Sequence, residues 1–538
     1  IGALAQGKKT GLTGKKVDLC EAQLISLVEQ DKKKSLELKK RTMLPHKTIK
    51  SLAKLIGSQQ YQKAFKYSED LLDKFSESAF LYNVCGAAKA GQGKFRCAIK
   101  FFKLALKLDP HNAEIFSNMS LAFKGLGKLE NAVACCEKAL QINPNYADAY
   151  SNLGAIFSDK KDFKLAIANY AKAIEINPEV AVTYYNMGTA LHDSGKPKSA
   201  IESYVKSIKI DSSYAEAYHG MGISFAKLGN LKEAIKNSEK AIEFKPDFSD
   251  AHNRLGISLA ENGNLESALE SFKRAVHIKP DFTDAIWNLS GMVTRISEAI
   301  YWLEKSLETN REHLLSILYL SALKAYNGDT TDFRALQNTS LRDNPMMRSF
   351  SWALRLEERP EIFFNRWKLF DRVIELSKSN RPFYEFGVFR GVAFKYFIDS
   401  FGEGFGFDTF QGIPEDWHHE KAGKYSSEGN IPEIEGGRFI VGKFEDTLPE
   451  FFSEARPLAS VVNFDADLYS STICALNFSK PIIDEHTILI FDEFLMNNHW
   501  EQDEYKALNE FCVVNGFSYK VIAISFHSKQ VVVKLQGT

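Results

Sequence analysis

The sequence predicts an α-solenoid followed by an α/β domain with a mostly parallel sheet. Three observations support this prediction. A period of 34 residues runs through much of the 538-residue chain, which is typical of stacked helical hairpins. From residue 360 onward, short apolar runs alternate with helical segments, as in a parallel sheet covered by helices. Several of these runs end in glycine or in acidic residues, which places candidate chemistry at one edge of the sheet.

The composition is that of an ordinary globular chain. Apolar residues make up 44% and charged residues 25%, and 68 Lys and Arg residues balance 68 Asp and Glu residues. This balance gives no support for a nucleic-acid partner or a charged membrane surface. The apolar runs are too short to span a bilayer, and the first thirty residues lack the apolar core of a secretory signal. The seven cysteines include no CxxC pair, so we expect reduced thiols and a cytoplasmic location.

Residues 1–44 are predicted to form an N-terminal helical cap. The segment begins with Gly, Lys and Thr residues and then gives an amphipathic, lysine-rich pattern near Asp18–Lys40. A charge run of this kind is typical of a solvated helix face. We therefore expect a helix that caps the repeats and carries no chemistry.

Residues 45–311 are predicted to form the helical repeats. Small residues recur with the 34-residue period and let two antiparallel helices approach closely, while aromatic residues fill the gaps and Pro or Ser ends the second helix. We count seven full units from Pro45 to about Phe282 and an eighth, from Thr283, that is cut short. The repeating positions are Pro110, Pro144, Pro178, Ser212, Pro246 and Pro280; Ala64, Ala98, Ala132, Ala166, Ala200, Ala234 and Ala268; and Gly86, Ser120, Gly154, Gly188, Gly222, Gly256 and Ser290.

This pattern resembles the tetratricopeptide repeat, which implies a superhelix whose concave face is lined by the first helix of each unit. Asparagines recur on that helix, and the segment Ala147–Gly154 resembles the repeats of O-GlcNAc transferase, where such asparagines hold peptides. A side-chain amide offers both donors and an acceptor to an extended peptide backbone. The alternative is that the asparagines only solvate the inner helix face. The candidate peptide-groove residues are Asn118, Asn152, Asn186 and Asn288.

Residues 312–359 are predicted to form a connector of two or three helices. Turn signals stand at Asn327-Gly328-Asp329 and at Asn344-Pro345, and leucine and isoleucine crowd residues 314–320. We expect these apolar residues to pack the last repeat against the next domain, and we find no candidate chemistry among them.

Residues 360–538 are predicted to form the α/β domain. Its last two strands are close in sequence, which predicts one antiparallel strand inserted into the parallel sheet. The expected elements are, in chain order, a helix over Glu361–Ser379, a strand ending at Glu385, an apolar helix to Phe401, strands over Gly404–Asp408 and Arg438–Val441, a helix beginning within Gly442–Pro449, strands ending at Phe464 and Phe491, a helix over Asp503–Asn515, and strands over Ser518–Ser525 and Gln530–Leu535.

The first strand–helix–strand unit of this domain is typical of a nucleotide-type cofactor site. A strand ends at Glu385, a glycine turn follows, and the next strand ends at Asp408, 21 residues after Gly387. An acid at that distance can accept hydrogen bonds from two ribose hydroxyls. Glu385 favours S-adenosylmethionine over a nicotinamide dinucleotide, because the amino-acid end of that cofactor carries an ammonium group that needs acceptors.

Four acids follow two other apolar runs: Asp465 and Asp467 come after the first, and Asp492 and Glu493 after the second. Two neighbouring strand ends would place these carboxylates around one point. Carboxylates so placed repel each other unless a cation or a proton lies between them. A hard divalent cation, most simply Mg²⁺, is the expected resolution. The alternative is that the acids cap the helices that follow the strands.

Four motifs within residues 380–495 resemble the macrocin O-methyltransferase family of S-adenosylmethionine-dependent enzymes: Glu385–Gly391, Gly406–Pro414, Asp465–Thr472 and Phe491–Phe494. The resemblance implies a class I Rossmann-like methyltransferase with a mostly parallel seven-stranded sheet. It also implies that Asp465, Asp492 and Glu493 hold a divalent metal and that Asp467 is the general base. The family usually has two aspartates at the last pair, so Glu493 departs from its pattern. The expected cofactor-binding residues are Glu385, Gly387, Phe389, Arg390, Gly391, Asp408, Thr409, Phe410, Glu445, Asp446 and Asp465.

These interpretations predict an O-methyltransferase that acts on a hydroxyl of a sugar or of a glycosylated or peptide acceptor, with the repeats recruiting the acceptor or a partner protein. The metal would bind the acceptor oxygen and lower its pKa, and Asp467 would take the proton. The segment Thr409–Gly437 is long and polar, as expected of a lid. One alternative is a non-catalytic tetratricopeptide scaffold with a degenerate methyltransferase domain. Another, glycosyl transfer, finds no supporting residues after residue 360.

Overall fold

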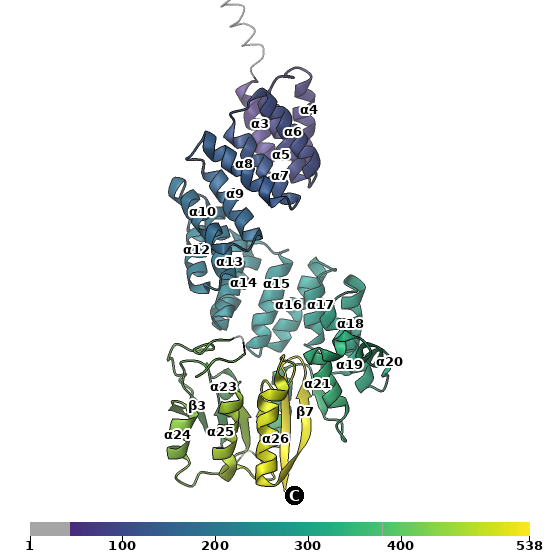
Figure 1. The fold of residues 1–538 in the computed structure, drawn as a ribbon, viewed down its shortest axis with the longest axis vertical. Coiled ribbons are helices and arrows are strands. Elements are labelled where there is room, and N and C mark those ends of the chain that lie inside the picture. Colours follow the sequence, from purple (N-terminus) through teal and green to yellow (C-terminus); the bar gives the residue numbers. More distant parts are fainter. Residues whose placement is uncertain (1–43, 379, 419, 538) are drawn as a thin grey trace, which may run out of the picture. The chain divides into compact units, whose positions relative to one another are not determined.

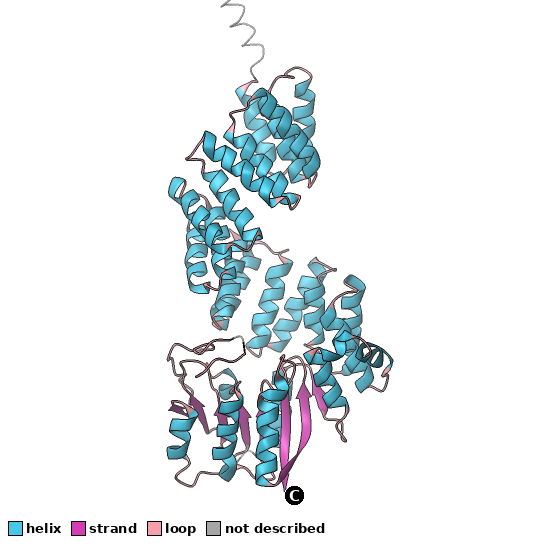
Figure 2. Ribbon diagram, viewed as in Figure 1, coloured by secondary structure: helices cyan, strands magenta, loops and turns pink. Residues whose placement is uncertain are grey.

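The computed structural model describes residues 44–378, 380–418 and 420–537 (Figure 1). The helix predicted near Asp18–Lys40 lies outside the described residues. The chain divides into two compact units, Ile1–Ser224 and Phe225–Thr538. Figure 2 shows the strands in magenta, and every strand among the described residues belongs to the second unit. No helix in the described part of the chain is long and apolar enough to cross a membrane.

The first unit consists of successive helix pairs with the predicted 34-residue period (Figure 1). The predicted close approach of helices is confirmed: a Cβ added at Gly86, Gly154 or Gly188 would lie within 2.6 Å of an aromatic ring on the second helix of the same pair. Side chains such as Asn112 and Asp162 cap helices by accepting a backbone N–H bond. The helices are α3 (His46–Gly57), α4 (Tyr61–Leu72), α5 (Ala79–Gly91), α6 (Phe95–Leu108), α7 (Ala113–Gly125), α8 (Leu129–Ile142), α9 (Ala147–Asp159), α10 (Phe163–Ile176), α11 (Ala181–Asp193) and α12 (Pro197–Ile210), followed by α13 (Ala215–Lys227), which runs into the second unit.

The second unit begins with further helices of the same kind. The eighth pair is shortened as predicted, because its first helix has 8 residues where the first helix of the preceding pair has 13. The predicted connector consists of three α-helices and one 3₁₀ turn. These elements are α14 (Leu231–Phe244), α15 (Ser249–Glu261), α16 (Leu265–Ile278), α17 (Thr283–Ser290), α18 (Ile296–Thr309), α19 (Leu314–Tyr326), α20 (Thr331–Gln337), η1 (Ser340–Asp343) and α21 (Pro345–Leu354).

The rest of the second unit is built around a mixed sheet of eight strands in the order β1-β7-β8-β6-β5-β2-β3-β4. Strand β8 is antiparallel to both its neighbours, which confirms the predicted inserted strand, and the other pairings are parallel. The strands are β1 (Glu361–Phe363), β2 (Phe383–Phe386), β3 (Gly404–Asp408), β4 (Gly437–Val441), β5 (Val461–Phe464), β6 (Ile488–Phe491), β7 (Phe517–Ser525) and β8 (Gln530–Gly537).

Two details of the predicted sheet domain are wrong. The sheet has eight strands where seven were expected, because the short β1 adds to the edge beside β7. The helix expected over Glu361–Ser379 is therefore a strand followed by α22 (Arg366–Leu376). The other helical elements of this part are α23 (Val392–Phe401), α24 (Phe444–Phe451), α25 (Tyr469–Ser479), η2 (Lys480–Ile482), η3 (Trp500–Gln502) and α26 (Glu504–Asn515).

Four phenylalanines fix the register of the central strands. Phe386 of β2 stacks on Phe407 of β3 at 4.8 Å and on Phe464 of β5 at 5.4 Å, and Phe464 stacks on Phe491 of β6 at 4.9 Å. Each stacked pair is also directly opposite in the strand register. A slip by one residue would turn these rings to the other face of the sheet, so the strand tips that follow them are held level with one another.

The last helix pairs and the sheet share one hydrophobic core within the second unit. Buried residues of α18, α19 and α21 belong to the same apolar cluster as the sheet strands. Three hydrogen bonds reinforce this packing: the Trp367 indole N–H donates to Ala260 O at 2.6 Å, the Asn365 amide donates to Gly291 O at 3.2 Å, and the Tyr319 hydroxyl donates to Phe526 O at 3.0 Å. The predicted packing of the connector against the sheet is thus confirmed.

Candidate functional site

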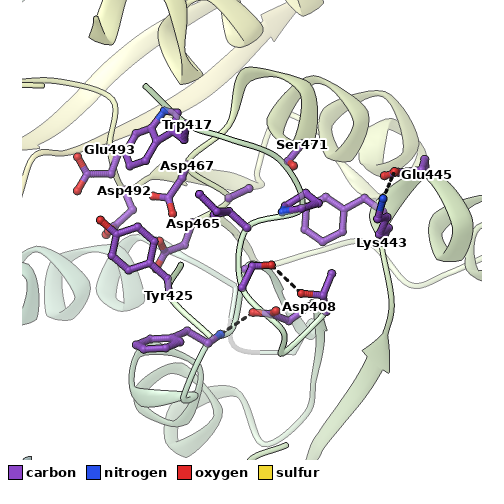
Figure 3. A pocket seen from close by; sticks show the side chains of 18 of the residues that line it. Asp408, Trp417, Tyr425, Lys443, Glu445, Asp465, Asp467, Ser471, Asp492 and Glu493 are labelled. Atoms are coloured by element: carbon purple, nitrogen blue, oxygen red, sulfur yellow. Dashed lines mark hydrogen bonds and ion pairs between the residues drawn. The ribbon is translucent and has the colours of Figure 1, made fainter. Parts of the chain in front are cut away.

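The carboxyl ends of β2, β3, β5 and β6 open onto a cavity of about 280 Å³ (Figure 3). The chain runs from β2 to β3 and β4 in one direction and then to β5 and β6 in the other, so strand order reverses between β2 and β5. Ligands of parallel sheets bind at such a switch point. Most of the predicted site residues meet here: Gly387, Phe389, Asp408, Thr409, Glu445, Asp465, Asp467, Asp492 and Glu493 line the cavity.

The glycine turn after β2 is pressed against β5. Gly387 has a φ of 94°, and a Cβ at this position would lie 1.8 Å from the carbonyl oxygen of Asp465. Asp408 at the tip of β3 fixes the turn, because its Oδ2 accepts N–H bonds from Val388 at 2.8 Å and Phe389 at 2.7 Å. The backbone at Gly387 can therefore approach a ligand closely, as a phosphate- or cofactor-binding turn requires.

Glu385 is a buried carboxyl at the end of β2, with 1% of its surface exposed. Its Oε1 accepts a bond from the Asn463 amide at 2.7 Å, whereas its Oε2 is buried with no partner among the residues that the structure describes. Burial raises the pKa of Glu385 well above its usual range, although the Asn463 bond opposes this shift. An acceptor left unpaired in the interior is costly, so a donor bound at this place would gain from meeting it.

Asp465 and Asp467 follow β5 on a strained turn. Asp467 has a φ of 59°, in the left-handed region that side chains other than glycine seldom adopt. Burial raises the pKa of Asp467 to about 8, and the nearby carboxylates of Glu493 and Asp492 add to the shift. Burial and the neighbouring Asp492 also raise the pKa of Asp465 well above its usual range. These two carboxyls hold protons more tightly than ordinary aspartates.

Asp492 and Glu493 at the tip of β6 are engaged by the start of β8. The Lys529 ammonium lies 2.9 Å from both carboxylate oxygens of Glu493, and the Gln530 amide donates to Asp492. The Glu493 backbone N–H donates to Glu504 at 3.1 Å. Glu504 is fully buried, and burial together with the nearby Asp492 and Asp467 raises its pKa well above the usual range. Lys529, Gln530 and Glu504 were not predicted as site residues.

Arg366 is the other site residue that the sequence did not reveal. It is the first residue of α22, and its guanidinium is attracted most strongly by Asp492 and then by Asp465, which raises its pKa. It lines the cavity at the strand tips and also a second cavity described below. Arg366 precedes the sheet motifs in the chain and belongs to none of them, so no sequence signal points to it.

The donor set does not fit the predicted divalent ion. Asp465, Asp492 and Glu493 do meet at one edge, but Glu493 is paired with Lys529 through both oxygens, Asp492 accepts from Gln530, and the positively charged Arg366 lines the same cavity. No three His, Cys, Asp or Glu side chains of residues 44–378, 380–418 and 420–537 are arranged to hold a metal. Metal ligands need free, deprotonated oxygens at short range.

The predicted lid is a long loop between β3 and β4 with one isolated bridge, Trp417 to Glu420. Trp417 and Tyr425 of this loop line the cavity beside the acids (Figure 3). The loop is held at two points: the His418 ring lies 3.0 Å from Asp503, and the Ser470 hydroxyl donates to Glu415. His419, the other lid histidine, lies outside the described residues.

The remaining predicted cofactor residues lie around the cavity rather than in its lining. Gly391 caps α23 with a φ of 73°, and Phe410 is buried with its backbone N–H donated to Asp408. Asp446 is exposed in the first turn of α24. Arg390 borders a second cavity instead, and its Nη1 lies against Gly229, where a Cβ would be 1.4 Å away.

A second cavity of about 500 Å³ lies between the sheet and the helices that precede it in the same unit. It shares Arg366, Phe389 and Asp465 with the first cavity. Buried polar atoms without a partner in the described residues border it: the Trp287 indole nitrogen, Nη1 of Arg390 and Oε2 of Glu385. One wall comes from the repeat helices, and its residues include Leu231, Ile257, Glu261, Trp287, Asn288 and Met292.

The predicted asparagine ladder is used between neighbouring repeats. The amide of Asn118 donates to Asn83 at 3.1 Å, that of Asn152 to the Ser117 hydroxyl at 2.9 Å, and that of Asn288 to Asn253 at 2.9 Å. Each acceptor precedes its donor by 35 residues and so belongs to the preceding pair. These bonds tie first helices together and leave fewer donors for a peptide. Asn186 occupies the equivalent place on α11 and is half-buried.

Comparisons with known proteins concern the helical part. Family models described as TPR repeat or tetratricopeptide repeat match residues 121–161 and 188–229, residues 147–180, and residues 219–281. Similar solved structures include YrrB, described as a TPR protein with an unusual peptide-binding site (28% identity, 34% of this chain, 95% of that chain, TM-score 0.29). Others are MamA (30% identity, 30% and 94% covered, TM-score 0.27) and a thermophilic TPR protein of Thermus thermophilus (19% identity, 34% and 99% covered, TM-score 0.31). A comparison with curated proteins gives no match.

Proposed function

We propose that the tetratricopeptide repeats, matched within residues 121–281, recruit a protein, peptide or glycan acceptor, and that the sheet domain methylates one of its hydroxyls from S-adenosylmethionine. Tetratricopeptide repeats are scaffolds that support protein–protein interaction through stacked helix pairs. The single observation that carries the enzymatic half is the buried, half-partnered Glu385 beside the Gly387 turn at the switch point.

The residues at the strand tips suit this cofactor. The free oxygen of Glu385 would accept from the ammonium group, and the Gly387 backbone would pass close to the methionine part. Asp408 would meet a ribose hydroxyl, since a carboxylate has about four acceptor positions and its three bonds to backbone N–H groups leave about one of them open. An eight-stranded sheet with one inserted antiparallel strand supports the same interpretation, because the seven strands other than β1 follow the order expected of a class I methyltransferase.

Bound there, S-adenosylmethionine would supply a methyl group on a positively charged sulfur. Asp467 would take the proton of the acceptor hydroxyl as the oxygen bonds to the methyl carbon; the carbon–sulfur bond breaks and its electron pair stays on sulfur. A pKa of about 8 suits Asp467 to this role, because a base works best when its pKa is near the working pH. Trp417 and Tyr425 of the lid would exclude water from the cavity.

The second cavity favours an acceptor that also contacts the repeats. Trp287 and Asn288 belong to the shortened helix α17, yet they border a space that continues to Asp465. An acceptor reaching Asp467 through this space would touch both the last repeats and the sheet. Such binding would raise the rate of methyl transfer, because the acceptor would be held where the reaction occurs.

The proposal is tested by titrating S-adenosylmethionine into the full chain in a calorimeter. We expect binding to the wild type and a loss of affinity of about tenfold or more for Glu385→Gln, because the bound ammonium would stabilise the carboxylate form of Glu385 and an amide cannot become charged. Glu485→Gln is the matched control, since Glu485 is an exposed acid with no place in the cavity, and its affinity should not change. Absence of binding to the wild type would leave a repeat scaffold without the proposed activity.

A further inference from the structure

The acids at the tips of β5 and β6 are met by positive charges that belong to the chain itself. Lys529 pairs with Glu493, and Arg366 lines the cavity at the strand tips together with Asp492 and Asp465. We infer that Arg366 and Lys529 occupy the place of the divalent cation, so that methyl transfer by this protein does not depend on a bound metal ion. The inference rests on the proposed methyltransferase function for its catalytic part and on the donor geometry alone for its binding part.

The register of strands β6 and β8 places Lys529 opposite Glu493. Strand β8 runs antiparallel to β6 with Phe491 opposite Val531. Continuing this register by two residues places Gln530 opposite Asp492 and Lys529 opposite Glu493, which are the pairs that the hydrogen bonds join. Lys529 has a φ of 65° in the turn between β7 and β8, and the Ser528 hydroxyl braces that turn through Ser525 at 2.6 Å. The strand register thus places the ammonium beside Glu493.

The extra carboxylate length at residue 493 fits this pairing. A glutamate reaches one methylene further from its strand than an aspartate, and here it meets the ammonium of the next strand with both oxygens at 2.9 Å. A bidentate pair that is partly shielded from water is costly to break, since either charge would then be left unpaired. A metal ion at Glu493 would have to compete with Lys529 at both carboxylate oxygens.

Arg366 is the second basic side chain that takes the place of the divalent cation beside the acids. Asn365 caps α22 by accepting the Lys368 N–H, which fixes the start of the helix, and its amide is also bonded to Gly291 O. Arg366 follows it directly and lines both cavities together with Asp465, so an acceptor oxygen placed beside Asp465 would lie in a cavity that Arg366 also borders. It would donate an N–H to that oxygen and stabilise the negative charge that develops as Asp467 removes the proton. Arg366 is a catalytic residue in this scheme, and Lys529 is a positioning residue.

Titrating Mn²⁺ into the full chain tests the inference without any acceptor. Binding is measured by electron paramagnetic resonance as the loss of the signal of the free ion. We expect no binding tighter than about 1 mM for the wild type, with or without S-adenosylmethionine. Removing either basic side chain should leave the acids without a positive partner. Lys529→Met and Arg366→Met should therefore each bind Mn²⁺ about tenfold more tightly than the wild type. Lys520→Met is the matched control, because Lys520 pairs with the exposed Glu358, and it should behave as the wild type.

Stoichiometric Mn²⁺ binding to the wild type at micromolar concentration would overturn the inference, as would cation-removing variants, shown to be folded by their thermal melts, that gain no affinity for Mn²⁺. A calorimetric titration of S-adenosylmethionine in EDTA and again in Mg²⁺ separates this inference from the proposed function. Equal affinities support metal independence, and an affinity that requires Mg²⁺ contradicts it. If S-adenosylmethionine binds in neither buffer, the proposed function fails, while the Mn²⁺ result still decides whether the acids form a metal site.

Discussion

At the scale of single residues, Asp467 combines three features that rarely occur together. Its backbone is left-handed with a φ of 59°, its carboxyl lies among other acids, and its pKa is raised to about 8. A left-handed backbone costs roughly 1–2 kcal/mol for most side chains and less for aspartate. Such strain persists only where the surroundings enforce it and is frequent at functional sites. Here both chain neighbours of Asp467, Ala466 and Leu468, are buried.

In the proposed reaction, Asp467 would make the rate of methyl transfer depend on pH. The carboxylate is the form that accepts a proton, and burial with nearby negative charge disfavours that form, so methyl transfer should rise as pH increases through about 8 and then level off. Asp467→Asn should lower the rate by about 10²- to 10⁴-fold and remove this rise. Transfer of labelled methyl groups to a lysate fraction measures both effects, with the exposed Asp399→Asn as control. A wild-type rate that is flat between pH 6 and about 9 would contradict the assignment.

The raised pKa of Asp467 also makes the stability of the folded protein depend on pH. Because the folded state holds the Asp467 proton more tightly than the unfolded chain, its contribution to stability is full below the unfolded pKa and falls as pH rises through about 8.

The sequence identified the acids of the site but not their partners. Asp408, Asp465 and Asp492 could be predicted because each follows a buried apolar run, and strand tips of a parallel sheet meet at one edge. Arg366 and Glu504 could not, because each begins a helix and belongs to no spacing pattern. Lys529 could have been predicted from the sequence. The predicted antiparallel final strand, once placed beside β6, sets residue 529 opposite residue 493.

At the scale of elements, the turns between paired helices show how one repeat differs from the others. Gly127 and Gly229 hold the same position in different repeats of the array, with φ values of 70° and 65°. A Cβ at Gly127 would meet nothing within 4 Å, whereas one at Gly229 would strike the Arg390 guanidinium. The glycine at residue 229 therefore serves both the turn and a contact to the segment that follows β2.

Gly229→Ala and Gly127→Ala separate these two roles. Both variants should lose about 1 kcal/mol of stability, because both place a side chain at positive φ. Only Gly229→Ala should also displace Arg390, one of the predicted cofactor residues, and so weaken S-adenosylmethionine binding measured by calorimetry. Equal binding by the two variants would show that Arg390 takes no part in holding the cofactor.

The elements that sequence patterns predict best are those with strong periodicity. The helix pairs and the four central strands agree with the prediction because their apolar periods are long or continuous. The strand β1 was missed since it has three residues, and its apolar pattern merges with that of α22. Its identity depends on the edge of β7, which no local window contains.

At the scale of the whole molecule, sequence motifs and packing divide the chain at different places. The motifs predict that the α/β domain begins at residue 360, but the compact unit that contains it begins at Phe225. Buried residues such as Leu303, Leu318 and Phe350 belong to the same core as the strands. Composition can reveal where a periodic pattern stops, whereas shared burial appears only once the chain is folded.

A fragment beginning at residue 360 should therefore be unstable. It would expose the apolar faces that α18, α19 and α21 cover, and each large buried side chain is worth about 1.5–3 kcal/mol. We expect the fragment Phe225–Thr538 to melt cooperatively when followed by circular dichroism, and the fragment 360–538 to bind a hydrophobic dye and melt without a clear transition. Two fragments with the same melting temperature would show that the sheet needs none of these helices.

The shortened helix α17 bears on which repeats of this protein could be exchanged by engineering. Because it stops at Ser290, Gly291 is left free to receive the Asn365 amide, and Ser290 and Trp287 meet His527 of the final hairpin. This makes α17 and α18 an adaptor, a shortened hairpin that joins the helical array to the mixed sheet. Repeat modules upstream of that adaptor could be swapped to change what is captured, while the same trimmed hairpin would be kept as the joint.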